Sequence, residues 1–114
     1  MQITRFEDIL SWQKGKELTL EIYRIFRNNK DYSFRDQIQR AAVSVGNNIA
    51  EGYERKSNKE LKQFLFISKG SCGEVRSMLA LAIELGYVTK DEYIVLNNLS
   101  IDISRLLSAF IKKL

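Results

Sequence analysis

FRDQIQRAAVSVGNNIAEGY, residues 34–53, is the stretch of the sequence that most clearly indicates the fold. Its apolar residues recur every three or four positions, which places them on one face of an α-helix. They are Phe34, Ile38, Ala41, Val45 and Ile49. A second line at helical spacing is polar and consists of Gln37, Arg40, Ser44, Asn47 and Glu51. The side chains between the two lines are small, so the stretch predicts a central helix that another helix can approach closely.

Three further segments show the same helical periodicity, and the expected helices cover about 6–27, 34–51, 58–85 and 90–112. Each expected start carries a capping pair: Thr4 with Glu7, Ser33 with Asp36, Ser57 with Glu60, and Thr89 with Glu92. Gly52 and Gly86 are predicted to end the second and third helices.

The chain has no proline, and its expected connections are only a few residues long. Short connections make consecutive helices antiparallel neighbours. The sequence therefore predicts an all-α protein, an up-down-up-down antiparallel four-helix bundle that forms one domain over residues 1–114.

The composition fits a single globular domain, because 45% of the 114 residues are hydrophobic. No apolar run is expected to approach the roughly 18 residues that cross a bilayer, and the N-terminus lacks the pattern of a signal peptide. The single cysteine, Cys72, fits a reducing compartment. We therefore expect a cytoplasmic protein without a membrane partner.

Residues that commonly carry catalysis are scarce. The sequence contains no histidine, which removes the commonest general base and the commonest metal ligand. It also contains no glycine-rich phosphate loop and no nucleophile elbow. Cys72 is interpreted as a small core residue rather than a nucleophile. We expect no enzymatic activity, no cofactor and no metal site.

The formal net charge of +4 favours polyanionic partners. One group of basic residues lies at the end of the first helix: Arg24, Arg27 and Lys30. Stabilisation of the helix dipole explains these three at least as well as nucleic-acid binding does. The second group lies in residues 53–69, and its candidates are Tyr53, Arg55, Lys56, Lys59, Lys62 and Lys69. There the tyrosine could stack a base while the cations hold phosphate, or the lysines could simply be solvated.

Polar residues on the second and third helices suggest contacts within or between bundles. Glu74 lies in an otherwise largely apolar line of the third helix, so we expect it to pair with Arg40 of the second helix. Gly70 and Gly73 are expected to let these two helices approach. Asn47, Asn48 and Glu51 are expected to satisfy backbone groups at the helix end or to contact a neighbouring subunit.

Three segments together resemble a known family: LSWQKGKEL (10–18), QIQRAAVSVGNNIAEGYERKSNKEL (37–61) and FLFISKGSCGEVRSMLALAIELGYV (64–88). They resemble the bacterial 23S rRNA intervening sequence proteins, in which the segment matching residues 45–52 usually reads Ile-Pro-x-Asn-Ile-Ala-Glu-Gly. Here Gly46 replaces the proline. The chain is also similar to the accessory variability determinant of diversity-generating retroelements. The resemblance implies a four-helix protomer in a ring-shaped homopentamer.

The function expected from the charge and the resemblance is that of a non-enzymatic, oligomeric accessory protein that binds RNA or DNA. The alternative is a protein-interaction scaffold whose charge serves only solubility. The expected partners are further copies of the chain, together with nucleic acid in the first case or another protein in the second.

Overall fold

The computed structural model describes residues 3–114, and these form an elongated bundle of helices measuring 42 × 22 × 19 Å. A 3₁₀ turn, Phe6–Asp8, precedes the four α-helices. The helices are α1 (Leu10–Phe26), α2 (Tyr32–Tyr53), α3 (Asn58–Glu84) and α4 (Lys90–Lys112). No strand occurs among the described residues. The predicted all-helical fold with four helices is confirmed.

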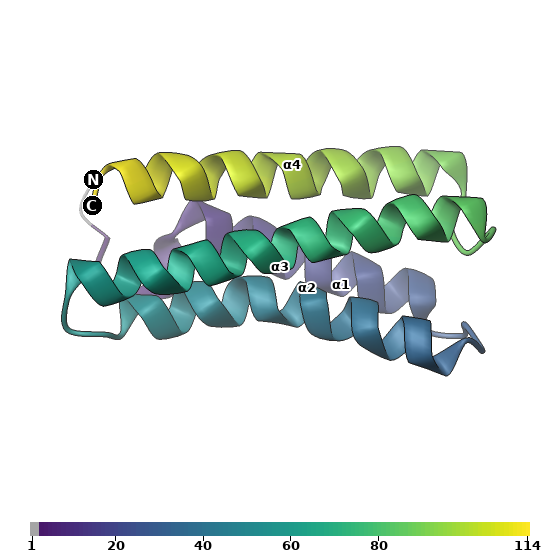
Figure 1. The fold of residues 1–114 in the computed structure, drawn as a ribbon, viewed down its shortest axis with the longest axis horizontal. Coiled ribbons are helices and arrows are strands. Elements are labelled where there is room, and N and C mark those ends of the chain that lie inside the picture. The colour runs from purple at the N-terminus through teal and green to yellow at the C-terminus, as the bar shows by residue number, and fades with distance from the viewer. Residues whose placement is uncertain (1–2) are drawn as a thin grey trace.

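The four helices lie side by side along the long axis of the molecule (Figure 1). The α1–α2 and α3–α4 connections lie at one end, and the α2–α3 connection lies at the other end, near the C-terminus. Each helix packs on two neighbours, in the cyclic order α1, α2, α3, α4, and the α2–α3 pair is the most extensive. The α2 helix therefore lies between α1 and α3.

The predicted apolar faces build the core. On α2, Ile38, Val45 and Ile49 are completely buried. On α3 the expected inner line is buried throughout: Leu61, Leu65, Ser68, Cys72, Val75, Leu79 and Ala82. From α4, Leu96, Ile103 and Leu107 complete the interior. Helical periodicity alone was thus enough to identify these core residues.

The α4 helix corrects the expectation that no segment is apolar enough to cross a membrane. By length and composition Lys90–Lys112 would be able to do so, because Asp102 and Arg105 are the only charges in its central part. The core helix of a bundle satisfies the same criteria, and here Leu96, Ile103 and Leu107 pack against the other helices.

The first helix begins later than predicted, because α1 starts at Leu10 instead of near Phe6. The Thr4–Glu7 capping box does not form; Ile9 caps α1 with an extended backbone and no side-chain hydrogen bond. Its side chain is 3% exposed and packs in the core. Burial of this apolar side chain outweighs the small gain of a local cap.

Other helix ends follow local rules more closely. Asp31, rather than Ser33, caps α2 by accepting a hydrogen bond from the Phe34 backbone N–H. Ser57 caps α3, and Thr89 forms the predicted capping box of α4. Gly86 ends α3 with a φ of +75°, a conformation that glycine adopts without steric strain.

The close approach of α2 and α3 is confirmed. The hydroxyl oxygens of Ser44 and Ser71 are 2.8 Å apart, and the buried Ser68 hydroxyl donates to the Val45 carbonyl at 2.7 Å. The predicted contribution of Gly70 and Gly73 is wrong, because both are exposed and would have open space beside an added Cβ.

Gly52 allows this approach instead, so its predicted role as a helix cap is wrong. It is buried within the last turn of α2, and an added Cβ would lie 2.7 Å from the Phe64 Cβ of α3. Gly46 has the same kind of role on the opposite side of α2. An added Cβ there would meet Trp12 of α1 at 3.4 Å.

Candidate nucleic-acid interface

The basic residues around the α2–α3 connection divide into paired and unpaired cations. Arg55 forms ion pairs with Glu51 at 2.8 Å and Glu60 at 3.9 Å, and its guanidinium carbon lies 5.0 Å from the centroid of the Phe64 ring. This arginine is held by its own neighbours, and its charge is largely compensated by them.

Lys56, Lys59 and Lys62 have no carboxylate within ion-pair distance in the described chain. Lys56 and Lys59 are exposed, and Lys62 is half-buried. These three lysines follow one another through the connection and the first turns of α3. They form an unpaired basic surface at this end of the bundle, which we call the lysine end.

Tyr53 is not free to stack on a base, as the sequence had suggested. Its ring packs against the core, and its hydroxyl donates to the Ile3 carbonyl at 3.0 Å. It instead attaches the N-terminal segment to the end of α2. Lys69 lies farther along α3 and is half-buried.

The other predicted basic group, which contains Arg24, Arg27 and Lys30, lies at the opposite end of the bundle, around the α1–α2 connection (Figure 1). Arg24 is paired with Glu21, with 2.6 Å between Nη2 and Oε2. Arg27 and Lys30 are exposed and have no ion-pair partner among residues 3–114. The candidates therefore do not form one continuous patch on a single chain.

The predicted Arg40–Glu74 ion pair is wrong. Glu74 is exposed and accepts a hydrogen bond from the Gln37 Nε2 at 3.4 Å, and Arg40 has no acidic partner in the described structure. Glu74 lies on the solvent-facing side of α3. Water therefore solvates its carboxylate, and no buried cation is required to neutralise it.

The remaining polar residues of α2 differ in their environment. Asn48 donates to both the carbonyl and the hydroxyl of Ser44 at 2.8 Å, which satisfies a backbone group within the helix rather than at its end. Glu51 is paired with Arg55. Asn47 is exposed and has no hydrogen-bond partner in the described part of the chain.

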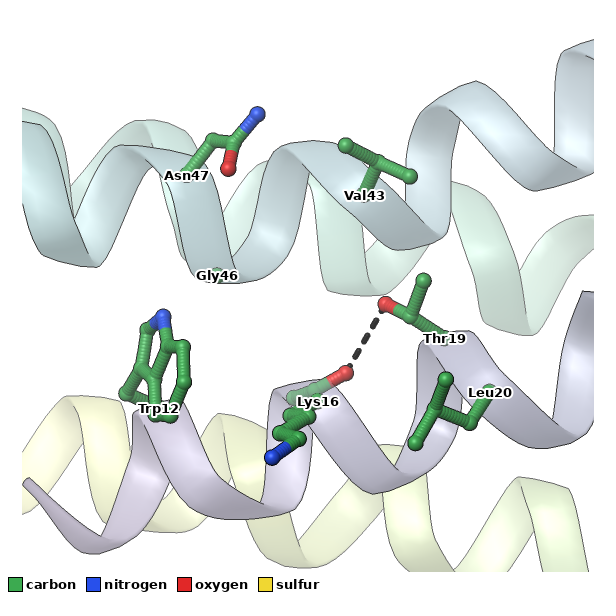
Figure 2. Close-up of a pocket in the computed structure, with 8 residues that line it drawn as sticks. Trp12, Lys16, Thr19, Leu20, Val43, Gly46 and Asn47 are labelled. Atoms are coloured by element: carbon green, nitrogen blue, oxygen red, sulfur yellow. Dashed lines mark hydrogen bonds between the residues drawn. The ribbon is translucent and has the colours of Figure 1, made fainter. Parts of the chain in front are cut away.

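Sequence reasoning missed a groove between α1 and α2. A hollow of about 160 Å³ lies there, and its lining residues are Trp12, Gly15, Lys16, Thr19, Leu20, Val43, Gly46 and Asn47. Figure 2 shows the side chains of α1 and α2 that face each other across it. A second hollow continues from Val43 and Asn47 to Arg40 and to Tyr23 of α1. The spacing of Trp12, Lys16, Thr19 and Tyr23, with steps of three and four, was a readable signal for an outward line on α1.

An apolar surface on the outer side of α3 was also missed. Phe66, Ile67, Leu81 and Leu85 are each between 52% and 56% exposed. Gly70 and Gly73 lie on the same outer side of the helix, where both are exposed. Large exposed apolar residues in such number indicate an interaction surface.

The chain offers little catalytic chemistry at these surfaces. Cys72 is buried, donates to the Ser100 carbonyl at 3.0 Å, and has its pKa raised to about 11 by burial. Its thiol is therefore protonated at neutral pH and is not an activated nucleophile. No cluster of acidic residues or cysteine suited to a metal ion occurs within residues 3–114.

Four helices around one apolar core, with unpaired cations at both ends, define a four-helix-bundle protein with a basic surface. The chain belongs to the 23S rRNA-intervening sequence protein family, whose family model matches residues 7–109. This confirms the resemblance seen in the sequence.

A solved structure has the same fold. It is the 1.70 Å crystal structure of a protein of unknown function from the S23 ribosomal protein family of Bacteroides thetaiotaomicron. The two superpose with a TM-score of 0.84 and 29% sequence identity, over 90% of this chain and 99% of that chain. None of the curated proteins compared with the chain matches it.

Proposed function

We propose that the protein is a non-enzymatic, oligomeric accessory protein that binds RNA or DNA through its basic surface in the bacterial cytoplasm. Its up-down-up-down antiparallel protomers would assemble into a ring-shaped homopentamer, as the family resemblance implies. No cofactor takes part in this proposal.

The observation that carries the proposal is the lysine end, formed by Lys56, Lys59 and Lys62. Cations already paired with carboxylates contribute little to binding a polyanion, whereas each unpaired cation can neutralise a phosphate and release a counterion. The three lysines lack acidic partners in the described structure, although Glu51, Arg55 and Glu60 form ion pairs close by.

Self-association is supported by the exposed apolar surface of α3, which includes Phe66, Ile67, Leu81 and Leu85. Burying it against a second copy would remove this surface from water. A pentamer would carry a formal charge of +20, five times the +4 of one chain. Several weak lysine ends on one particle would then hold a polyanion through their high effective concentration.

The test is a binding titration with a structured RNA and a duplex DNA at two salt concentrations. Tight binding at low salt that weakens steeply with added salt, and with little sequence preference, is the expected result. The triple variant Lys56→Glu, Lys59→Glu and Lys62→Glu should abolish it. No binding of either polymer at low salt would refute the proposal.

A matched variant separates the lysine end from the net charge of the chain. Arg76, Lys90 and Arg105 are exposed and form no ion pair in the described chain, and their reversal to Glu changes the charge by the same amount. Binding should be reduced less in this variant than in the lysine-end variant. Equal losses would mean that overall charge, and not the lysine end, drives binding.

The second candidate function is a protein-interaction scaffold, favoured by the same exposed apolar surface on α3. A scaffold would tolerate reversal of the lysine end, but it would lose its partner when the apolar surface is changed. Phe66→Ser and Leu81→Ser distinguish the two functions. In a nucleic-acid-binding oligomer, these two substitutions should reduce the affinity for nucleic acid only as far as they reduce assembly. Light scattering measures the assembly.

A further inference from the structure

The groove between α1 and α2 is not explained by packing within the bundle. Trp12 lies at one end of it. Its side chain is partly buried and packs in part against the core, but it also lines the groove, and its indole nitrogen points toward α2 near Gly46 (Figure 2). The Phe6 ring meets the indole edge-on at 5.2 Å and helps to fix it in place. Tyr23, which is 43% exposed, lies farther along α1 at the second hollow.

The polar groups of the groove that lack partners are mainly hydrogen-bond donors. The Trp12 indole N–H, the Lys16 ammonium and the Arg40 guanidinium can donate only, and none has an acceptor among residues 3–114. The Asn47 carboxamide between them is also unpaired. Glu51 lies at the edge of the groove, but its carboxylate is paired with Arg55. A complementary ligand must therefore supply acceptors and negative charge.

The walls of the groove add flat apolar surface to these donors. Trp12 and Tyr23 are eleven residues apart on α1, which corresponds to roughly 16 Å along the helix. The Lys16 ammonium lies 5.9 Å from the centroid of the Trp12 ring, so a cation accompanies the aromatic surface. Aromatic rings interleaved with unpaired cations are the arrangement that binds unstacked bases together with their phosphates.

We infer that this groove binds a short segment of single-stranded nucleic acid, with a base against Trp12 and phosphates against Lys16 and Arg40. The inference rests on the proposed function and adds a second surface to the lysine end. Single strands fit better than a duplex, because duplex bases are already stacked on one another and cannot reach an indole in a hollow of about 160 Å³.

The readout is direct, because Trp12 is the only tryptophan in the chain. Single-stranded oligouridylate and a duplex of equal length are titrated at low salt, with two signals recorded: quenching of Trp12 fluorescence, and anisotropy of a dye on the nucleic acid. We expect saturable quenching by the single strand at the concentrations that raise the anisotropy. The duplex should raise the anisotropy through the lysine end without quenching.

Variants test the assigned contacts. Lys16→Gln and Arg40→Gln should each lower the log–log salt slope for the single strand by about 0.7, the value for one lost phosphate contact. Arg76→Gln, at an arginine of α3 that is also exposed, should leave the slope unchanged. Trp12→Leu should weaken anisotropy-detected binding by about 5- to 150-fold, and Trp12→Phe, which keeps a ring, by less.

The outcomes separate this inference from the proposed function. Two results would overturn the assignment of single-strand binding to the groove: binding without quenching of Trp12, or a salt slope that is unchanged in Lys16→Gln and Arg40→Gln. Either result would leave the proposed function standing. Loss of all anisotropy change with both polymers would overturn both. A change of oligomeric state in Arg40→Gln, with no effect on quenching, would assign the groove to a second copy of this chain and overturn the inference.

Discussion

Gly52→Ala tests the contact between α2 and α3 most directly. In the interior of an exposed helix this substitution would stabilise the protein by about 0.5–1 kcal/mol, because glycine loses more backbone entropy on folding than alanine. At Gly52, however, the new Cβ would lie 2.7 Å from the Phe64 Cβ and 3.1 Å from the Leu61 Cδ1. Carbon atoms pack optimally at about 3.5–4.0 Å, so the first contact is roughly 1 Å too short.

The Phe64 Cβ cannot move aside by a change of rotamer, since it is bonded directly to the α3 backbone. The two helices must therefore separate locally, and overpacking of this kind costs about 1–3 kcal/mol. Subtracting the middle of the helix-propensity gain from the middle of the overpacking cost, we expect Gly52→Ala to lower the free energy of unfolding by about 1 kcal/mol. Gly73→Ala is the matched control: its Cβ meets nothing within 4 Å, so it should gain about 0.5–1 kcal/mol.

Urea unfolding followed by circular dichroism measures both variants, at one fixed protomer concentration because assembly would add to apparent stability. The expected result is a lower midpoint for Gly52→Ala and a higher one for Gly73→Ala, with unchanged slopes. If Gly52→Ala is as stable as the unsubstituted protein, or more stable, the close approach of α2 and α3 at Gly52 is refuted.

Three further predictions concern hydrogen bonds and the thiol. Cys72, whose burial raises its pKa to about 11, should react with a thiol reagent at pH 8 only after the protein unfolds; rapid labelling of the folded protein would contradict its burial. The Tyr87 hydroxyl donates to the Asp31 carboxylate at 2.6 Å and, together with the Phe34 N–H, lowers the pKa of that carboxyl. The stability that these hydrogen bonds contribute should be fully present above the pKa of Asp31 in the unfolded chain, and it should be lost as the pH falls through the lowered pKa of the folded protein. The stability difference between the unsubstituted protein and Tyr87→Phe should therefore shrink in acid, and a pH-independent difference would contradict this linkage. Ser68→Ala removes a buried hydrogen bond to the Val45 carbonyl and should cost about 0.5–1.5 kcal/mol in urea unfolding, unlike the exposed Ser77→Ala control.

The family resemblance and the core were readable from the sequence, but most polar contacts were not. The inner line of α3, from Leu61 to Ala82, is buried throughout because period and burial are linked by helix geometry. No comparable rule predicts whether Arg40 and Glu74 form an ion pair. Whether two charges on neighbouring helices meet depends on how far each helix is rotated and shifted, and spacing within one helix does not contain that information.

The same limit applies to the candidate binding residues. Most of the basic candidates are exposed, yet Arg24 and Arg55 form ion pairs with Glu21 and Glu51. Tyr53, which looked free, attaches the N-terminal segment through its hydroxyl. The groove between Trp12 and Asn47 escaped notice because its two walls lie on different helices, 23 to 35 positions apart in the chain.

Periodicity, turn chemistry and the central stretch at residues 34–53 were together sufficient to determine four helices, their inner faces and the caps at Thr89 and Gly86. These features depend on neighbours within a few residues along the chain. Three others required helices from different parts of the chain to pack: the start of α1 at a buried Ile9, the contact of Gly52 with Phe64, and the groove beside Gly46. Each of these depends on the distance between two backbones, which is set by the packing of the whole bundle.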